Sequence, residues 1–169
     1  MKKAISWILT IALLLSFVPA GTLTLPAEAA STVASGTCGD NLTWTLDSAG
    51  TLTISGSGAM KDYLYYTYTT PWFSYRASIK TVIIGTDVTS IGNFAFSDCT
   101  GLTGELIIPD SVTSIGEEAF IQCTGLTSVT IGNSVETIGS SAFYGCTSLT
   151  SVTLGNSVKT ISGSTFSRC

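Results

Sequence analysis

Apolar residues in the second half of the chain recur with a fixed period. Isoleucine, alanine, phenylalanine and cysteine return together every 23 or 24 residues, in copies of Ile-Gly-x-x-Ala-Phe-x-x-Cys that begin at Ile91, Ile115, Ile138 and, less faithfully, Ile161. A period of 20 to 50 residues is typical of stacked repeats, so the pattern predicts a solenoid. One copy cannot bury its own apolar face, and neighbouring copies must therefore share a continuous core.

Each copy divides into short elements, most clearly in the third. Val129 and Ile131 alternate as on one face of a strand, and a Gly-Asn-Ser turn and a second extended piece follow. The stretch from Ser140 to Cys146 suits one helical turn, with serine as its cap. We therefore expect a β-rich repeat solenoid, a right-handed α/β-type coil with short helical turns. Its four repeats are predicted at 79–101, 102–125, 126–148 and 149–169.

The periodic aromatic and cysteine positions are the predicted core. They are Phe96, Cys99, Phe120, Cys123, Phe143, Cys146, Phe166 and Cys169. Equivalent residues on adjacent strands are about 4.8 Å apart and point the same way, whereas a disulfide needs converging Cβ atoms about 3.8 Å apart. This favours buried free thiols over the disulfides that an exported chain would otherwise suggest. Cys38 lies outside the repeat.

The second copy departs from the period. It carries one extra residue around Gly104-Glu105, and Pro109 stands where the other copies have the turn glycine. We expect a small bulge in the strand of this copy.

Residues 30–78 are predicted to form an N-terminal cap. Leu42, Trp44 and Leu46 alternate with polar residues, a turn follows, and the alternation resumes at Leu52, which predicts a β-hairpin. Before this cap, residues 1–29 have the charged start, apolar run and Ala-x-Ala site of an export signal. No later stretch is apolar enough to span a membrane, so we expect a secreted or cell-surface protein.

Composition and charge exclude several functions. Without residues 1–29 the chain keeps five of its seven basic residues and ten of its eleven acidic ones, a net charge of −5 that argues against nucleic-acid binding. The absence of histidine excludes histidine-dependent catalytic triads and histidine metal sites. Glu117 and Glu118 are adjacent and fit a solvated surface better than a glycosidase pair. We expect no enzyme activity, no metal and no cofactor.

The repeat, with Leu-x-x-Val-x-Ile before Val-x-x-Ile-Gly-x-x-Ala-Phe-x-x-Cys, resembles the BspA-type leucine-rich repeat over residues 79–169. The segment from Cys38 to Gly56 resembles the module that often precedes such repeats. The resemblance implies an exported or surface-attached binding scaffold, implicated in adhesion, with no catalytic residue to carry over. Because the chain stops at Cys169 before another repeat begins, we expect it to be truncated.

Two surfaces are candidate binding sites. An aromatic cluster in the cap includes Tyr63, Tyr65, Tyr66 and Tyr68, while Trp72 and Phe73 within it are better explained as a seal over the first repeat. The other surface is the outward face of the strands, with Ser128, Thr130, Ser151 and Thr153, preceded by Lys80, Thr81, Glu105 and Ile107.

The leading hypothesis is a non-catalytic adhesion module that binds an extracellular protein or glycan. Two alternatives remain at this point: the binding front end of a larger exported enzyme, and a structural spacer.

Overall fold

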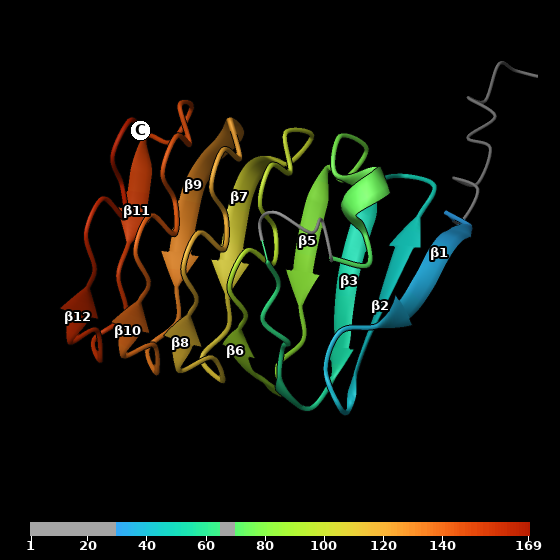
Figure 1. Ribbon diagram of the computed structural model, residues 1–169, viewed down its shortest axis with the longest axis horizontal. Coiled ribbons are helices and arrows are strands. Elements are labelled where there is room, and N and C mark those ends of the chain that lie inside the picture. Colours follow the sequence, from blue (N-terminus) through green and yellow to red (C-terminus); the bar gives the residue numbers. More distant parts are fainter. Residues whose placement is uncertain (1–29, 65–69) are drawn as a thin grey trace, which may run out of the picture.

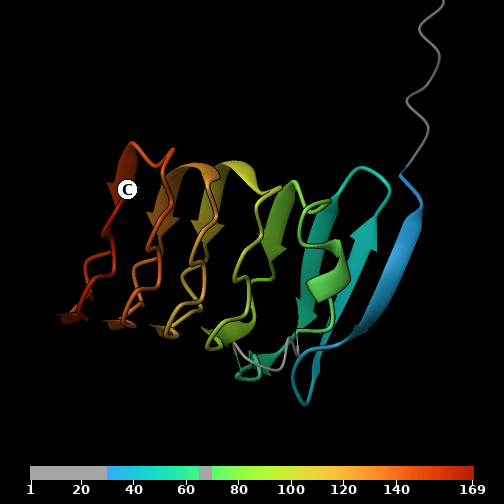
Figure 2. The ribbon, with the colours of Figure 1, turned by 45° about the horizontal axis from the view of Figure 1, so that its top comes forward.

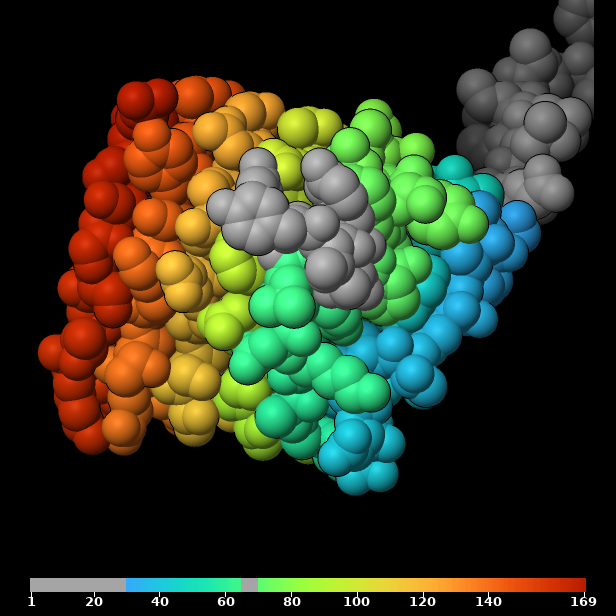
Figure 3. Space-filling view, viewed as in Figure 1, coloured from blue at the N-terminus to red at the C-terminus, as the bar shows by residue number. Residues whose placement is uncertain are grey.

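The protein is a solenoid whose coils stack along one long axis (Figure 1). The computed structural model describes residues 30–64 and 70–169, so the predicted export signal and the tyrosines at 65, 66 and 68 lie outside the described residues. Each coil passes through a long strand, a short strand and a turn segment, which together enclose the core (Figure 2). In space-filling view the sequence colours form parallel transverse bands, as expected when each coil contacts only its neighbours (Figure 3).

The long strands form the first side, in two sheets. The first sheet has the order β1 (Thr32–Thr37), β2 (Leu42–Asp47), β3 (Thr51–Gly56), β5 (Thr81–Ile84). The second has β7 (Thr103–Ile108), β9 (Gly125–Ile131) and β11 (Ser151–Thr153). Strands β1 to β3 pair antiparallel, which confirms the predicted hairpin, and all later pairs are parallel. The change from antiparallel to parallel pairing at β3 joins the cap directly to the repeats.

The short strands form the second side, a five-stranded parallel sheet. Its members are β4 (Gly58–Ala59), β6 (Val88–Ile91), β8 (Ser114–Ile115), β10 (Thr137–Ile138) and β12 (Thr160–Ile161). Their isoleucines are in register, since Ile115 pairs with Ile91 on one side and with Ile138 on the other. The Val-x-x-Ile of each repeat is therefore the short inward-facing strand of its coil.

The third side consists of turns, and the predicted helical turns are wrong. Among the described residues, helical structure is limited to the 3-10 turn η2 (Phe73–Tyr75). In the turn segments alternate N–H groups bond within the coil and to the next coil: Ala95 donates to Gly92, but Phe94 and Phe96 donate across to Glu117 and Ala119. A helix would direct every N–H along its own axis, whereas this arrangement ties neighbouring coils together.

Left-handed backbone makes this alternation possible. Glu118 and Gln122 have φ of 50° and 58°, and the equivalent positions of the other coils are also left-handed. Such a conformation costs a non-glycine residue roughly 1–2 kcal/mol. The hydrogen bonds between coils offset that cost, which explains why the strain recurs with the repeat.

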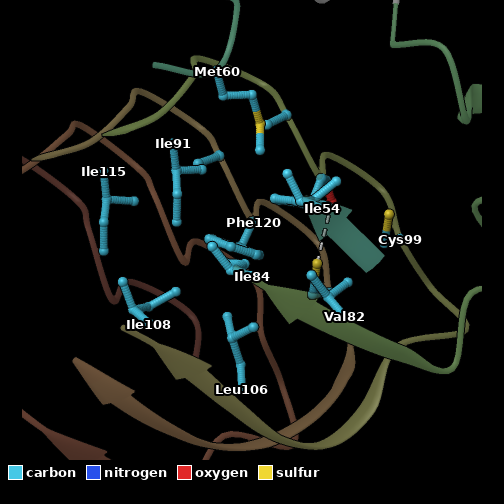
Figure 4. Close-up of a cluster of buried hydrophobic side chains, with 14 of the residues drawn as sticks. Ile54, Met60, Val82, Ile84, Ile91, Cys99, Leu106, Ile108, Ile115 and Phe120 are labelled. Atoms are coloured by element: carbon cyan, nitrogen blue, oxygen red, sulfur yellow. Dashed lines mark hydrogen bonds between the residues drawn. The ribbon is translucent and has the colours of Figure 1, made fainter. Parts of the chain in front are cut away.

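The core consists of columns of equivalent side chains. Phe96, Phe120 and Phe143 have no exposed surface, whereas Phe166 of the last coil is half-buried. Their rings stack at centroid distances of 4.9 to 5.5 Å and interplanar angles of 2° to 11°. Figure 4 shows the aliphatic part of this core, in which Val82, Ile84, Leu106 and Ile108 from the long strands meet Ile91 and Ile115 from the short ones.

The aromatic column begins in the cap. Trp72 stacks on Phe96 at 5.4 Å, and its indole N–H donates a hydrogen bond to the Ala95 carbonyl at 2.9 Å. Trp44 and Tyr63 then contact Trp72 edge-on, at 5.7 and 6.0 Å. Trp72 therefore fills the phenylalanine position of a first, irregular coil, and the other two rings close the end of the column.

The glycine of Ile-Gly is required by backbone packing between coils. A Cβ placed on Gly116 would lie 2.5 Å from the Asn93 backbone nitrogen, and one on Gly139 would lie 2.5 Å from the Glu117 backbone nitrogen. Real Cβ atoms do not approach this closely, so a side chain here would push the coils apart.

Candidate functional site

The outward face of the long strands presents side chains in two parallel columns. The register places Glu105 beside Ser128 and Ser151, and Ile107 beside Thr130 and Thr153. On the other side, Thr51 and Thr53 pair with Thr81 and Ile83. The expected serine and threonine residues therefore do lie in rows on one face, formed mainly by hydroxyl groups and isoleucines.

This face carries little charge. Within the described strands β3, β5, β7, β9 and β11, Glu105 is the one charged residue. Its carboxylate accepts a hydrogen bond from the Thr130 hydroxyl at 3.1 Å, which holds it against the sheet. A partner would therefore meet a hydroxyl-rich surface with a single fixed negative charge.

Ile83 belongs to this face, although the sequence analysis did not place it there. It is 49% exposed, and Ile107 beyond it is 58% exposed, whereas Val82 and Ile84 point into the core. The run Val82-Ile83-Ile84 is apolar throughout, so it gives no alternation to show which residue faces outward. The 24-residue offset to Ile107, already assigned to the outward face, is the signal that would have found it.

The two sheets of long strands separate between β5 and β7. The backbone N–H of Thr103 donates to the Lys80 carbonyl at 3.1 Å, but β5 and β7 belong to different sheets with no ladder between them in the described chain. A cavity of about 360 Å³ opens there, with Ile83, Ile107 and Pro109 among its lining residues. The predicted bulge is confirmed beside it, as a register shift between Gly104 and Glu105.

The tyrosine-rich part of the cap gives a weaker candidate. Tyr63 is only 7% exposed and packs against Trp72, so it is a core residue and offers no open stacking surface. Tyr65, Tyr66 and Tyr68 lie outside the described residues. Trp72 is fully buried, and half-buried Phe73 lies under the Arg76 guanidinium at 3.9 Å. The described aromatic residues of the cap therefore seal the solenoid.

The cysteines are free thiols with a structural role. The Sγ atoms of Cys123 and Cys146 each donate to the carbonyl of a phenylalanine in the preceding coil, at 3.3 Å. Burial raises the pKa of the Cys99 and Cys146 thiols to about 12 and that of Cys38 to about 11. These thiols are protonated at neutral pH, so they are poor nucleophiles and poor metal ligands.

Other polar groups are accounted for by local structure. Burial, together with Glu117 and Asp98 nearby, raises the pKa of Glu118. A cavity of about 550 Å³ at the hairpin end includes Asp47, but one Asp47 carboxylate oxygen already accepts from the backbone of Ala49 and Thr51. The residues that the structure describes contain no cluster of three potential metal ligands. Within the same ranges, no helix has the length and apolar character needed to span a membrane.

Solved structures with similar folds are bacterial repeat proteins. A leucine-rich repeat protein from Eubacterium ventriosum ATCC 27560 is 27% identical, with a TM-score of 0.53 over 70% of this chain and 40% of its own. A leucine rich cell surface protein from Faecalibacterium prausnitzii A2-165 is also 27% identical, with a TM-score of 0.51 over 79% of this chain and 46% of its own. The T. pallidum leucine-rich repeat protein is 27% identical, with a TM-score of 0.56 over 76% of this chain and 65% of its own.

The chain thus spans about 40 to 65% of the length of these structures. No curated protein matches it. Residues 69–169, more than half of the chain, match six copies of the sequence model for the BspA type leucine-rich repeat region. The period, the stacked coils and this match agree, and the chain belongs to the BspA-type leucine-rich repeat family.

Proposed function

We propose that this protein is a non-catalytic binding module of the bacterial cell surface or its surroundings, and that the face of long strands contacts an extracellular protein or glycan. The observation that carries the proposal is the row of outward side chains across β5, β7, β9 and β11. They are exposed or half-exposed, held in register by the parallel ladders, and nearly uncharged. Repeat proteins commonly bind along such extended faces.

Three further observations support the proposal. The buried thiols are protonated, and the carboxylates have no partner group arranged for catalysis among the described residues. A similar solved structure is a leucine rich cell surface protein. The export signal predicted at residues 1–29 fits the same location.

The test compares two pairs of threonines from the same coils. Thr130 and Thr153 are neighbours on the long-strand face, whereas Thr137 and Thr160 are neighbours on the short-strand side. The full chain would be measured by biolayer interferometry against a panel of extracellular-matrix proteins and a glycan array. Any specific ligand should lose affinity for the Thr130→Lys/Thr153→Lys variant and keep it for the Thr137→Lys/Thr160→Lys control.

Either of two results contradicts the proposal. One is a panel with no ligand above background. The other is a ligand whose affinity falls equally in both double variants, because this would place the contact elsewhere or reflect general misfolding. Circular dichroism of each variant excludes the misfolding explanation.

A further inference from the structure

The departures of the second repeat from the period all act at one place on the binding face. The extra residue at Gly104-Glu105 shifts the register of β7, and Gly104 takes a left-handed φ of 77°. Pro109 follows at the end of the same strand and has no N–H to donate toward β5. In the equivalent position of the preceding coil, Gly85 does donate to Ile54, at 2.9 Å. These changes remove ladder bonds at both ends of the β5–β7 contact.

The result is a notch in an otherwise continuous surface. We use "notch" for the space of about 360 Å³ between β5 and β7, lined by Thr81, Val82, Ile83, Ile84, Thr86, Glu105, Ile107 and Pro109. Its depth shows in the core residues beneath it: Val82 and Ile84 keep 6% and 7% exposure, whereas Leu106 and Ile108 across the gap have 0% and 1%. The notch therefore reaches the edge of the core.

The chemistry of the notch restricts what can occupy it. Its walls are aliphatic, and no aromatic ring lines it on which a sugar could stack. Its volume lies at the small end of the roughly 300–1,000 Å³ typical of ligand pockets, so it suits a side chain better than a whole organic ligand. The exposed edges of Ile83 and Ile107 offer the kind of apolar pocket that a protein hot-spot residue fills.

Charge supplies the second restriction. Glu105 lines the notch and is the one charge in the described long strands of the repeats, while the chain as a whole is acidic. A partner with a basic residue beside its apolar side chain would pair that residue with Glu105, whereas an acidic partner would be repelled.

We propose that the notch is the anchoring pocket for a protein ligand, and that it takes an aliphatic side chain next to a lysine or arginine in an extended segment. This inference rests on the proposed function, because it names the partner class and the anchoring point on the same face. It also identifies the second repeat, the least regular in sequence, as the one that determines specificity.

The experiment uses a phage-displayed library of random 12-residue peptides, selected on the immobilised full chain. Enriched peptides should carry an aliphatic residue within two positions of a lysine or arginine. Synthetic versions should bind the Ile83→Ser/Ile107→Ser variant at least about tenfold more weakly, the loss expected for a hot-spot contact. Both isoleucines are about half exposed, so this variant should keep the fold, and circular dichroism would verify it.

Glu105 gives an independent measurement. Glu105→Gln should weaken the same peptides by up to about fivefold at low salt and should remove most of the salt dependence of binding. Thr137→Lys/Thr160→Lys, on the short-strand side, should leave peptide affinity unchanged.

Several outcomes would overturn the proposal. These are a library that enriches no peptide, enriched peptides that are acidic or lack an aliphatic residue, and peptides that bind the isoleucine variant as tightly as the parent. If a matrix protein binds the long-strand face but ignores the isoleucine and Glu105 variants, the notch is refuted and the proposed function stands. If no panel member binds at all, the proposed function fails on its own evidence.

Discussion

Replacing Phe120 with alanine tests whether the aromatic column holds the coils together. The Phe120 ring is fully buried and lies between Phe96 at 4.9 Å and Phe143 at 5.2 Å. A buried phenylalanine reduced to alanine costs about 3–5 kcal/mol. The ring also takes part in two stacked pairs, each worth about 0.5–1.5 kcal/mol beyond burial. We therefore expect a loss near the top of the range, about 4–5 kcal/mol in the free energy of unfolding.

Phe166→Ala is the matched control. It deletes the same atoms from the same column, but Phe166 is half-buried and has one ring neighbour, Phe143, at 5.5 Å. Partial burial and a single stacked pair limit the expected loss to about 1–2 kcal/mol. The difference between the two variants isolates the effect of position within the column from that of the substitution itself.

Urea unfolding followed by two probes would measure the losses. Far-UV circular dichroism reports on the strands of all coils, and tryptophan fluorescence reports on the cap, where Trp44 and Trp72 lie. The reasoning is refuted if Phe120→Ala loses less than about 1 kcal/mol, or if the two variants lose equal amounts. Separate transitions from the two probes would show that the cap and the coils unfold independently, and each would then be compared by itself.

Three further predictions address packing, thiol reactivity and pH. Gly116→Val should destabilise the fold by about 1–3 kcal/mol in thermal melts because its Cβ meets the backbone of the preceding coil, whereas Gly163→Ala, with open space around it, should be neutral; equal effects would contradict the packing argument. In native protein at pH 8, Ellman's reagent should modify exposed Cys169 quickly and the four buried thiols only after urea is added; fast reaction of all five would refute their burial. The folded state binds the Glu118 proton more tightly than the unfolded state, so the stabilisation is complete below the ordinary pKa of 4.5 and is lost as pH rises toward the raised value. Glu118→Gln should remove this part of the pH dependence of Tm, and an unchanged profile would count against it.

The period in the sequence predicted the columns of the core. Equivalent residues separated by 23 or 24 positions, such as Phe96 and Phe120, do stack at the same place in successive coils. The same spacing extends to Trp72, 24 residues before Phe96, but the different residue type and the irregular cap sequence concealed it. Residue identity was the weaker guide, and position within the period was the stronger.

The local conformation of the turn segments could not be read from the same pattern. Ser140 to Cys146 has the three-residue spacing of a helical turn, yet alternate N–H groups there bond to the next coil. Left-handed backbone at Ser141 makes this possible, and serine has no strong preference for that conformation. Contacts between coils decide the structure, and no single repeat contains that information.

The candidate site was predicted in part. The strict alternation in β9 and β11 placed Ser128, Thr130, Ser151 and Thr153 in rows along one face. The bulge at Gly104 was also visible as one extra residue. The separation of β5 from β7 was not, because it depends on how two neighbouring strands pair.

The stack of rings from Trp72 to Phe166 also gives the chain an order of assembly. A ring in the column gains its partners only when the adjacent coil is in place, and each coil contacts residues only about 23 or 24 positions away. The loop that must close to add a coil is therefore the same length for every coil, so the entropic cost of each addition stays constant. We expect the cap to fold first, since its antiparallel hairpin is local, and the coils then to add one after another on the Trp72 surface. The cap would act as the template for the growing solenoid as well as the cover over its end.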